Sequence, residues 1–465
     1  MFRSIANTFT NCFKIPELKS RILFTLGVLA ICRLMTWIRI PGLNGEALTT
    51  FFSHTTQSGG GMLGLYNTFA GGAVEHCAIG SLGIMPYISA TIIIQLLTAV
   101  WPKLSKLARE ENGRTKIIQY GRYLTVLLCL GQGLFFAMGY EHPAKIFGQG
   151  IGRLVLYNDD QLWWYRIQAV LIMTTGTMLL MWLGEQISDR GIGNGVSLVI
   201  TIGIVARLPR ALVALKDMFF PAGGIKSEYH FAGTGVMLLI LLVLVIGGVI
   251  AITQAQRKVP VQYAQRAVGR KMYSGGTSFM PLRVNYSGVM PIIFAQSILM
   301  FPQAIFLHLA NFVSVPFLKS LFMGLAQNLN SGSVLYLVIY ALMILFFAYF
   351  WVATQFNELQ IADDLKKNGG YIPGVRPGQG TSDYLHKSMS RITLAGAIFL
   401  MVIATIPIIL SRQMTIPYDV SQFFGGTSIL ITVGVLLDTM RQVESHLMMR
   451  HYDGFLKKGR LRGRF

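Results

Sequence analysis

The chain has 465 residues, of which 53% are hydrophobic and only 13% are charged, and its mean hydropathy is +0.53. This composition excludes an ordinary soluble domain and indicates a protein that lies largely in a membrane. Lys and Arg number 40 against 20 Asp and Glu, so the loops outside the bilayer must carry a net charge of +20 and are strongly basic.

A helix needs roughly 20 apolar residues to cross the hydrocarbon core of a membrane. Ten segments of this kind lie near residues 22–38, 78–100, 118–139, 167–184, 195–213, 235–253, 288–307, 333–355, 391–411 and 424–438. The sequence therefore predicts an all-α polytopic membrane protein with ten transmembrane helices.

The first span carries Arg33 inside its apolar run. Basic residues before such a run are also typical of a signal peptide, but no small-residue cleavage site follows, so we expect the segment to be retained. If residues 1–21 are a cytoplasmic segment, most loop Lys and Arg fall on the cytoplasmic side, as the positive-inside rule requires. Ten spans then place both termini in the cytoplasm, with a basic tail at 441–465.

The apolar segment MLGLYNTFAGGA, at residues 62–73, is too short to span a membrane. An irregular loop in lipid could not satisfy its backbone hydrogen bonds, so at membrane depth the segment has to be buried in protein or line a cavity. Gly71 and Gly72 are expected to end it and to let the chain turn.

The second and seventh spans contain proline, serine and glutamine among their apolar residues: Pro86, Ser89, Gln95, Pro291, Gln296, Ser297 and Pro302. Such residues usually serve helix packing, but interrupted segments in the two halves of a chain also indicate inverted repeats. We expect Pro86 to loosen its helix. We also expect Ser89, Thr91 and Gln95 to face a seam, where a polar group finds a partner across the helix pair.

The spans lack the groups that an ion-coupled transporter or a membrane enzyme needs. No Asp or Glu lies mid-span, and the chain has no HExxH and no GxSxG. The four cysteines are far apart, without CxxC or metal-ligand spacing. The stretch GIGNG at 191–195 follows a membrane helix rather than a strand, so we interpret it as a tight turn. The sequence predicts no catalytic site, no metal site and no cofactor.

Two long loops, near 254–287 and 357–390, face the cytoplasm in this topology. The first has no acidic residue and contains Arg257, Lys258, Arg266, Arg270, Lys271 and Arg283. Such a loop attracts anionic lipids, but interleaved tyrosines and a second long loop on the same face favour a binding arm. An RNA-rich ribosome or an acidic motor protein would suit this charge.

Five stretches together resemble the SecY family, the protein-conducting channels of the bacterial Sec translocon. They read GGAxxxxxIxxLGIMPYISAxIIIQLL, MWLGEQIxxRGIGNG, QRKVPVQYAQR, ADDLKKNGGYIPGVRPGQGT and FFGGTSILI. The resemblance runs in order from about residue 16 to the tail, with agreeing span positions.

The resemblance implies two inverted five-helix halves, here 22–215 and 216–440, around a central pore, with the segment near 62–73 as a plug half-helix. Unfolded preproteins would cross through the pore, and signal sequences or membrane segments would leave through a lateral gate. The implied partners are the small subunits SecE and SecG, the motor ATPase SecA, the ribosome and anionic lipids. The implied location is the inner membrane of a bacterium.

The resemblance also assigns residues. The implied pore ring consists of Ile84, Ile88, Val196, Ile200, Ile293 and Ile431, which would resist ion flow by dewetting. The implied plug includes Met62, Tyr66, Phe69, Gly71 and Gly72. The implied lateral gate includes Ser89, Ile92, Gln95, Ser297 and Phe301. The implied docking residues are Arg266, Arg270, Lys271 and Arg376, the last on a turn that Pro373 and Pro377 should stiffen.

The chain departs from the family pattern in places. Thr253 and Gln254 replace a charged pair that commonly leaves the sixth span, and Val196 stands where isoleucine is frequent in the ring. Two other functions remain as alternatives to a protein-conducting channel. One is a secondary transporter for a small solute, and the other is a membrane scaffold or insertase without a pore.

Overall fold

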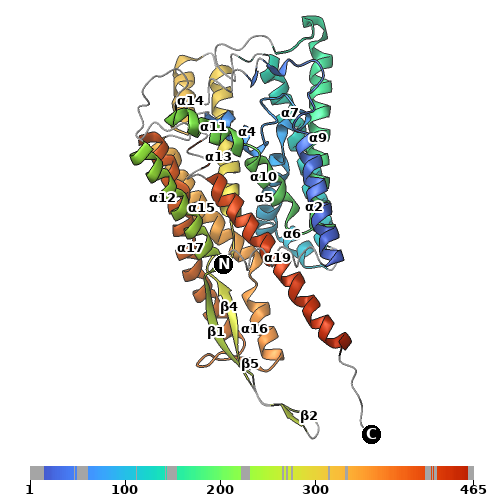
Figure 1. Cartoon of the computed structure of the whole chain (residues 1–465), viewed down its shortest axis with the longest axis vertical. Helices are drawn as coiled ribbons and strands as arrows, with labels where there is room; N and C mark the ends of the chain where they lie inside the picture. Colours follow the sequence, from blue (N-terminus) through green and yellow to red (C-terminus); the bar gives the residue numbers. More distant parts are fainter. Residues whose placement is uncertain are drawn as a thin grey trace. The chain divides into compact units, whose positions relative to one another are not determined.

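The computed structural model in Figure 1 describes residues 15–46, 48–49, 61–110, 113–141, 143, 154–220, 231–263, 266–268, 271–273, 276–312, 315–329, 333–413, 420, 423 and 427–458. They belong to two compact units. Unit 1 comprises Met1–Ser227, Pro417–Val420 and Val435–Phe465, and unit 2 comprises Glu228–Ile416 and Ser421–Gly434. The inverted relation of the halves 22–215 and 216–440 stays a prediction.

Helices occupy all ten positions where the sequence predicts spans. Among the described residues, seven are long and apolar enough to cross a membrane: Ile79–Val100, Thr115–Glu141, Leu162–Arg190, Gly195–Phe219, Gly233–Gln254, Val334–Lys367 and Gln379–Ile406. The other three predicted spans correspond to α2 (Pro16–Leu34), α13 (Met290–Phe312) and α19 (Thr427–Lys458). Charged residues lie near both ends of α2 and in the second half of α19, and the apolar run described in α13 is only Met290–Leu299.

Unit 1 begins with α2 and the short helix α4 (Gly61–Phe69), followed by a 3-10 turn, η2 (Ile79–Leu82). Next come α5 (Met85–Val100) and α6 (Pro102–Arg109), and then α7 (Gly113–Glu141), the 3-10 turn η3 (Asp159–Gln161) and α9 (Leu162–Arg190). The helices α10 (Gly195–Val205) and α11 (Leu208–Phe219) and the second part of α19 complete the unit.

The start of α5 corrects the expected role of Pro86. The proline lies in the first turn of the helix, where it breaks no hydrogen bond because the first backbone N–H groups of a helix have no partner within it. The predicted span 78–100 is therefore a 3-10 turn followed by a helix, rather than one helix loosened in its middle. Gly83, with φ 58°, turns the chain between the two.

The predicted span 195–213 is also two helices. The side chain of Asn194 caps α10 by accepting a hydrogen bond from the Ser197 N–H at 3.2 Å. Pro209 lies in the first turn of α11, and a proline disfavours helical geometry in the residue before it. Residues 191–194 form the bend between α9 and α10, as the reading of GIGNG as a turn requires.

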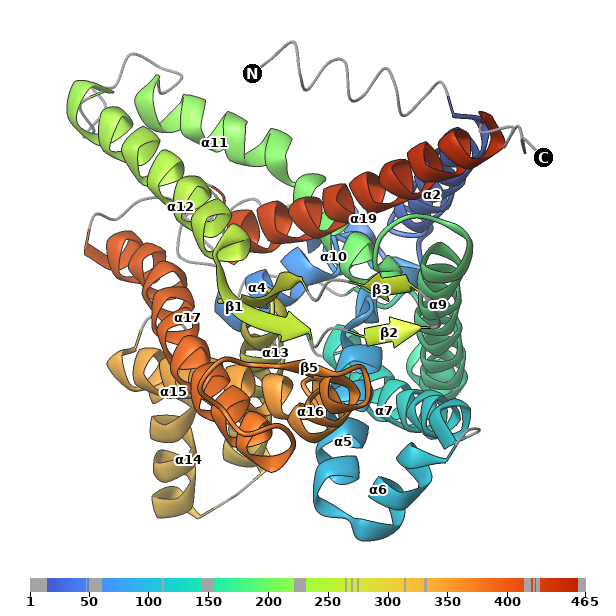
Figure 2. The same cartoon turned by 90° about the horizontal axis from the view of Figure 1, so that it is seen from below.

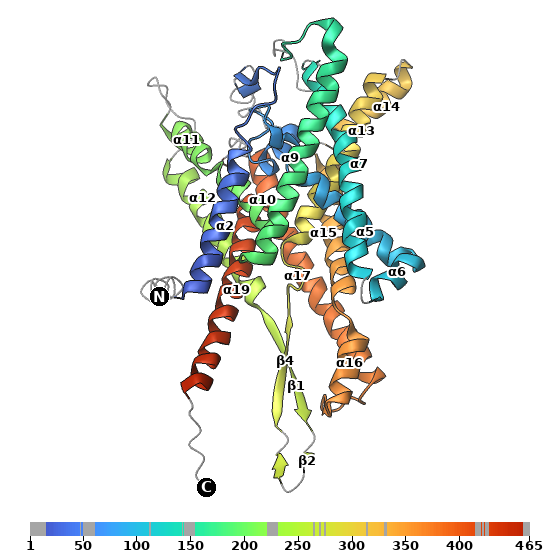
Figure 3. The ribbon, with the colours of Figure 1, turned by 90° about the vertical axis from the view of Figure 1, so that its right-hand side faces the viewer.

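The helices α7 and α9 run side by side (Figure 3) and are joined by an ion pair at each end. At one end, Arg122 donates two hydrogen bonds to the Glu185 carboxylate, at 3.2 and 2.7 Å. At the other end, Arg166 donates two to Glu141, both at 2.7 Å. Paired, parallel hydrogen bonds between a guanidinium and a carboxylate are among the strongest in proteins.

Unit 2 begins with a short π-helical turn, η4 (Phe231–Gly235), and α12 (Val236–Gln254). The strands β1 (Gln256–Tyr263), β2 (Arg266–Val268), β3 (Lys271–Tyr273) and β4 (Thr277–Arg283) lead to α13 and α14 (Pro316–Asn328). The unit continues with α15 (Val334–Gln355), α16 (Glu358–Lys367), β5 (Gly370–Tyr371), α17 (Gln379–Gln413) and the first two turns of α19. Aromatic contacts join α13 to α15, with the Phe294 ring 5.4 Å from that of Trp351.

The two predicted cytoplasmic loops contain strands that the sequence analysis did not predict, although the spans are helical as expected. One sheet has the order β4-β1-β5, and both strand pairs are antiparallel. β1 pairs with β4 from Gln256↔Arg283 to Gln262↔Thr277, and with β5 at Gln262↔Tyr371. A second sheet pairs β2 with β3. Figure 2 shows these strands and α16 from below.

Candidate functional site

The helix α4, in the segment predicted to be a plug, is held inside unit 1. Tyr66 and Phe69 are buried, and the Tyr66 hydroxyl donates to the Leu82 carbonyl at 2.9 Å. The Tyr66 ring lies 5.0 Å from the ring of Phe136 on α7. The side chain of Met62 lies outside the described residues. The described part of α4 therefore has the protein surroundings that so short an apolar segment needs.

Two glycines with left-handed backbone turn the chain at the end of α4. Gly71 has φ 66° and Gly72 has φ 87°, and the Gly72 N–H donates to the Asn67 carbonyl at 2.8 Å. A Cβ atom on Gly71 would lie only 3.0 Å from the Cα of Gly203 on α10. Arg33, the charged residue inside the first span, donates to the carbonyl of Gly71.

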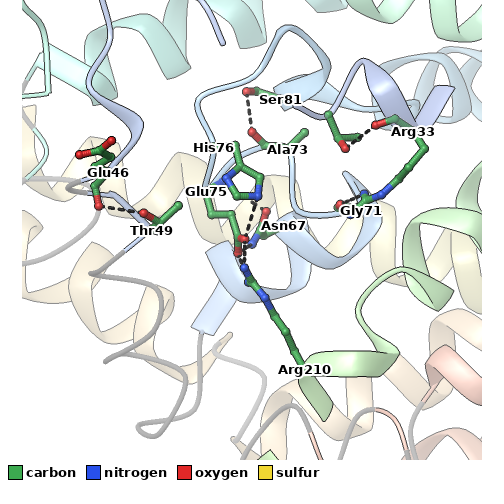
Figure 4. A network of polar contacts seen from close by, with 11 residues as sticks. Arg33, Glu46, Thr49, Asn67, Gly71, Ala73, Glu75, His76, Ser81 and Arg210 are labelled. Atoms are coloured by element: carbon green, nitrogen blue, oxygen red, sulfur yellow. Dashed lines mark hydrogen bonds and ion pairs between the residues drawn. The ribbon is translucent and has the colours of Figure 1, made fainter. Parts of the chain in front are cut away.

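A buried carboxylate follows α4 directly (Figure 4). Glu75 is 1% exposed, and it forms an ion pair with Arg210 of α11, with an Nη1–Oε2 distance of 2.6 Å. The Asn67 side-chain amide donates to the same Oε2 atom at 3.0 Å. The His76 ring lies 3.4 Å from the carboxylate and stacks on Trp37, with 4.9 Å between ring centroids.

The residues predicted to form the pore ring occur in both units. In unit 1, Ile84 and Ile88 are buried one turn apart at the start of α5, and the Ile88 N–H donates to the Ile84 carbonyl at 3.2 Å. Val196, half-buried, and Ile200, buried, are similarly spaced on α10. In unit 2, the ring members are Ile293 and Ile431, both buried. Assembly of these six side chains into one ring stays a prediction.

The polar residues of α5 that were predicted to face a seam do not all bond across a helix pair, contrary to the prediction. The hydroxyls of Ser89 and Thr91 donate to carbonyls of their own helix, those of Met85 and Tyr87, at 3.0 and 2.8 Å. A serine or threonine in a helix can satisfy itself in this way without a neighbouring helix. The Oε1 atom of Gln95 is buried and has no hydrogen-bond partner among the described residues.

Two of the remaining predicted gate residues are buried, one on α5 and one in unit 2. Ile92 is buried on α5, and Ser297 is buried on α13, where its hydroxyl donates to the Ile293 carbonyl at 2.7 Å. Phe301 is in α13, but its side chain lies outside the described residues. A hydrogen bond to another helix is made by Gln296, the residue before Ser297, whose side-chain amide donates to Thr427 of α19 at 3.0 Å.

The described docking residues lie on strands and between turns of unit 2. Arg266 and Lys271 are in β2 and β3, whereas Arg270 lies outside the described residues. Arg376 is exposed between two turns, in which Gly374 and Gly378 have φ 81° and 93°. These glycines set the conformation of the turns in addition to the two prolines that the sequence analysis emphasised.

The sheet β4-β1-β5 joins both long loops into one body. Its inner face packs on the ends of α15 and α17 through a cluster of apolar residues: Val259, Val261, Leu282, Val352, Phe356, Ile372, Leu385, Met389 and Ile392. Arg257, Lys258 and Arg283 are exposed on β1 and β4. Thr253, at a departure from the family pattern, donates to the Val249 carbonyl at 2.7 Å, and Gln254 is exposed.

We expect Ile372→Asp to separate the second loop from the first. Ile372 is 3% exposed, and burying an unpaired carboxylate there should destabilise the attachment of β5 by roughly 2 kcal/mol or more. Limited proteolysis of the folded protein should then cut residues 357–390 faster. The matched control is Tyr371→Ser, because Tyr371 is the neighbouring residue, at the end of β5, and is exposed. Equal cleavage of the two variants would contradict the prediction.

Comparison with known proteins relates this arrangement to a family. A family model of SecY matches residues 78–440. A protein translocase subunit SecY of Chlamydia trachomatis is 42% identical over 462 residues, which cover 98% of this chain and 99% of the relative. The chain belongs to the SecY family. The SecY translocase subunit of Thermotoga maritima is 40% identical over 462 residues, with the same coverage of both chains.

Solved structures share the fold of this SecY-family chain. The structure of a protein-conducting channel matches it with a TM-score of 0.56 and 17% identity, over 95% of this chain and 94% of the other. A second has a TM-score of 0.55 and 17% identity over the same shares, and in that SecY protein the plug domain stabilises the closed state of the translocation channel and maintains a membrane seal. The chain is thus a multi-pass membrane protein with the fold of a protein-conducting channel.

The sequence analysis missed the polar network around Glu75, although two signals for it were present. Glu75 is the one acidic residue between Glu46 and Glu110. Arg33 was recognised as a charge inside a span, and such a charge generally has a partner. The partner of Arg33 is a backbone carbonyl, which no side-chain pattern could reveal. The partner of Glu75 lies far along the chain, on α11.

Proposed function

We propose that this chain is the channel subunit of a protein translocase, which passes unfolded preproteins across a membrane and releases membrane segments laterally into the bilayer. The observation that carries the proposal is the near full-length identity of 42% to a translocase subunit SecY. The exposed basic residues on β1 and β4 and the enclosed helix α4 are the features that such a channel would use. The chain conducts its substrate and carries out no chemical step of its own.

In this proposal α4 is the plug, and Ile84, Ile88, Val196, Ile200, Ile293 and Ile431 form the constriction. Aliphatic walls resist the flow of ions and water by dewetting. They also bind no passing side chain tightly, because they offer it neither charge nor hydrogen bonds. The gate would lie where α5 and α13 present Ser89, Ile92, Gln95, Ser297 and Phe301.

The partners are proposed from the charge and position of the docking residues. The motor ATPase SecA and the ribosome would dock on Arg266, Arg270, Lys271 and Arg376, and SecE and SecG would be the small subunits. The channel Sec61 in a canine ribosome–channel complex has the same fold, with a TM-score of 0.52, which is consistent with docking of this kind. We place the chain in the inner membrane of a bacterium, with both termini cytoplasmic and anionic lipids around its basic loops.

Reconstitution tests the proposed function. Liposomes that contain this chain, its two small subunits, the motor ATPase and ATP should protect an added preprotein from external protease. A preprotein that stays fully digestible, in liposomes shown to contain the assembled complex, would contradict the proposal. Saturable uptake of a small solute without the motor would instead indicate a secondary transporter.

Deletion of residues 62–73 tests the plug. We expect the resting ion conductance of the reconstituted channel to rise about tenfold or more, since losing as little as about 1.4 kcal/mol of closed-state stability changes the open population tenfold. The comparison is the undeleted chain at equal protein density in the same liposomes. An unchanged conductance, in a deleted chain that still transports preprotein, would contradict the assignment of α4 as a plug.

A further inference from the structure

Helix α4 is surrounded by more positive charge than negative charge. Three arginine side chains contact α4 or the residues that follow it in the chain: Arg33 of α2, Arg207 at the start of α11, and Arg210 within α11. Arg33 donates to the Gly71 carbonyl, and Arg207 donates to the Thr68 hydroxyl. Cations near the carboxyl end of a helix are favoured by its dipole, but three guanidinium groups also repel one another.

The carboxylate of Glu75 lies among these arginines and is held there by hydrogen bonds from Arg210 and Asn67. Arg210 Nη1 donates to its Oε2 atom at 2.6 Å, and Arg210 Nη2 forms an ion pair with its Oε1 atom at 2.5 Å. The Asn67 amide donates to the carboxylate at 3.0 Å, and the Asn67 side-chain oxygen accepts from the Glu75 N–H at 3.4 Å. The carboxylate thus bridges a side chain of α4 and a side chain of α11, two elements that are far apart in sequence.

The protonation states keep this bridge charged at neutral pH. Burial by itself raises the pKa of the Glu75 carboxyl, but the hydrogen bond and charge of Arg210, the charge of Arg207 and the Asn67 hydrogen bond together bring it below its usual value. Burial lowers the pKa of the neighbouring His76 and outweighs the attraction of Glu75, so its ring is neutral at pH 7.

We propose that Glu75 is a positioning residue that latches α4 to α11, so that α4 moves only when the carboxylate releases Asn67 or Arg210. This inference rests on the proposed function, in which α4 is the plug. The side chain of Arg210 is 52% exposed, so water can solvate the arginine once the pair separates. The latch is therefore able to reopen, unlike an ion pair that is sealed from water on both sides.

The test is the resting ion conductance of the complete reconstituted complex with Glu75→Gln. The substitution keeps the shape of the side chain and removes its charge, which leaves three arginines without their carboxylate. We expect the conductance to rise about tenfold, since breaking one partner of a buried pair is strongly destabilising and a tenfold change corresponds to about 1.4 kcal/mol. Preprotein transport should persist.

Unit 1 supplies a matched control in Glu141→Gln. Glu141 has a side chain only 3% exposed and forms a close ion pair with an arginine, as Glu75 does, but it joins α7 to α9. Both substitutions should lower thermal stability, whereas only Glu75→Gln should raise the resting conductance. Equal resting conductance in the two variants would overturn the proposal.

A double-mutant cycle distinguishes a latch through Arg210 from a general loss of packing. If Glu75 acts through Arg210, Glu75→Gln combined with Arg210→Gln should leak no more than the worse single variant. Additive leaks would overturn the pairing.

If Glu75→Gln does not fold, Asn67→Ala leaves the ion pair in place and removes the α4 side of the bridge. Asn67→Ala should then leak about as much, and a folded Asn67→Ala with normal conductance would overturn the latch.

The outcomes separate this proposal from the proposed function. Normal resting conductance of Glu75→Gln, in a complex that transports preprotein, would refute the latch and leave the channel intact. Failure of the unsubstituted complex to transport preprotein would refute the proposed function itself.

Discussion

Replacing Arg376 with glutamate should reduce motor-driven preprotein transport about a hundredfold while leaving the protein folded. Arg376 is exposed between two turns, and the hydrogen bond that it contributes to the local structure is made by its backbone carbonyl, which accepts from the Thr381 hydroxyl at 3.0 Å. Opposing like charges across an interface costs several kcal/mol, and each 1.4 kcal/mol is a factor of ten. The measurement is the rate of ATP-dependent protection of a preprotein in liposomes.

Lys387→Glu is the matched control for this prediction. Lys387 is exposed on α17, in the same long loop, so the two variants have the same net charge. If the partner contacts the Arg376 turn, only Arg376→Glu should lose transport. Equal losses would show that the loop attracts its partner by overall charge alone, and normal transport by Arg376→Glu would remove Arg376 from the docking site.

Gly195→Val should prevent unit 1 from folding. A Cβ atom on Gly195 would lie 1.8 Å from the carbonyl oxygen of Gly184 and 2.7 Å from its carbonyl carbon. Both are backbone atoms of α9, so no side chain can move aside, and α10 would have to separate from α9. We expect a loss of stability greater than about 4 kcal/mol, which is exceptional for one substitution. The yield of monodisperse protein in detergent and its thermal unfolding measure the effect.

Gly247→Val provides the comparison, because nothing lies within 4 Å of a Cβ built on Gly247 of α12. This variant adds the same side chain to another membrane helix and should give a yield close to that of the unsubstituted protein. If Gly195→Val gave the same yield as Gly247→Val, the close approach of α9 and α10 would be wrong.

The helical spans could be predicted from the sequence because hydropathy reports directly on whether a segment can lie in lipid. The positions of all ten helices followed from it, and the family comparison confirms the fold class. Hydropathy does not report where backbone geometry changes inside an apolar segment. The prolines at 86 and 209 mark helix starts, and local turn chemistry would have indicated this.

The sheet and the polar site depend on contacts between distant parts of the chain. Val259 and Val261 alternate with exposed residues on β1, which is a strand signal, but its partner β5 lies beyond four intervening helices. Ser89 was expected to bond across a seam, yet its own helix satisfies it. The assignments of ring, gate, plug and docking residues remain proposals, of which the deletion of residues 62–73 tests the plug and Arg376→Glu tests the docking site.

The pairing of β1 with β5 connects the Arg376 turn mechanically to membrane helices of unit 2. β1 continues directly from α12, and β4 leads into α13, while β5 precedes the Arg376 turn by only a few residues. A partner that pushes on this turn would therefore transmit its force through the sheet to two membrane helices at once. A motor docked on this turn, as proposed above, would thus act on α12 and α13 through the paired strands β1 and β4.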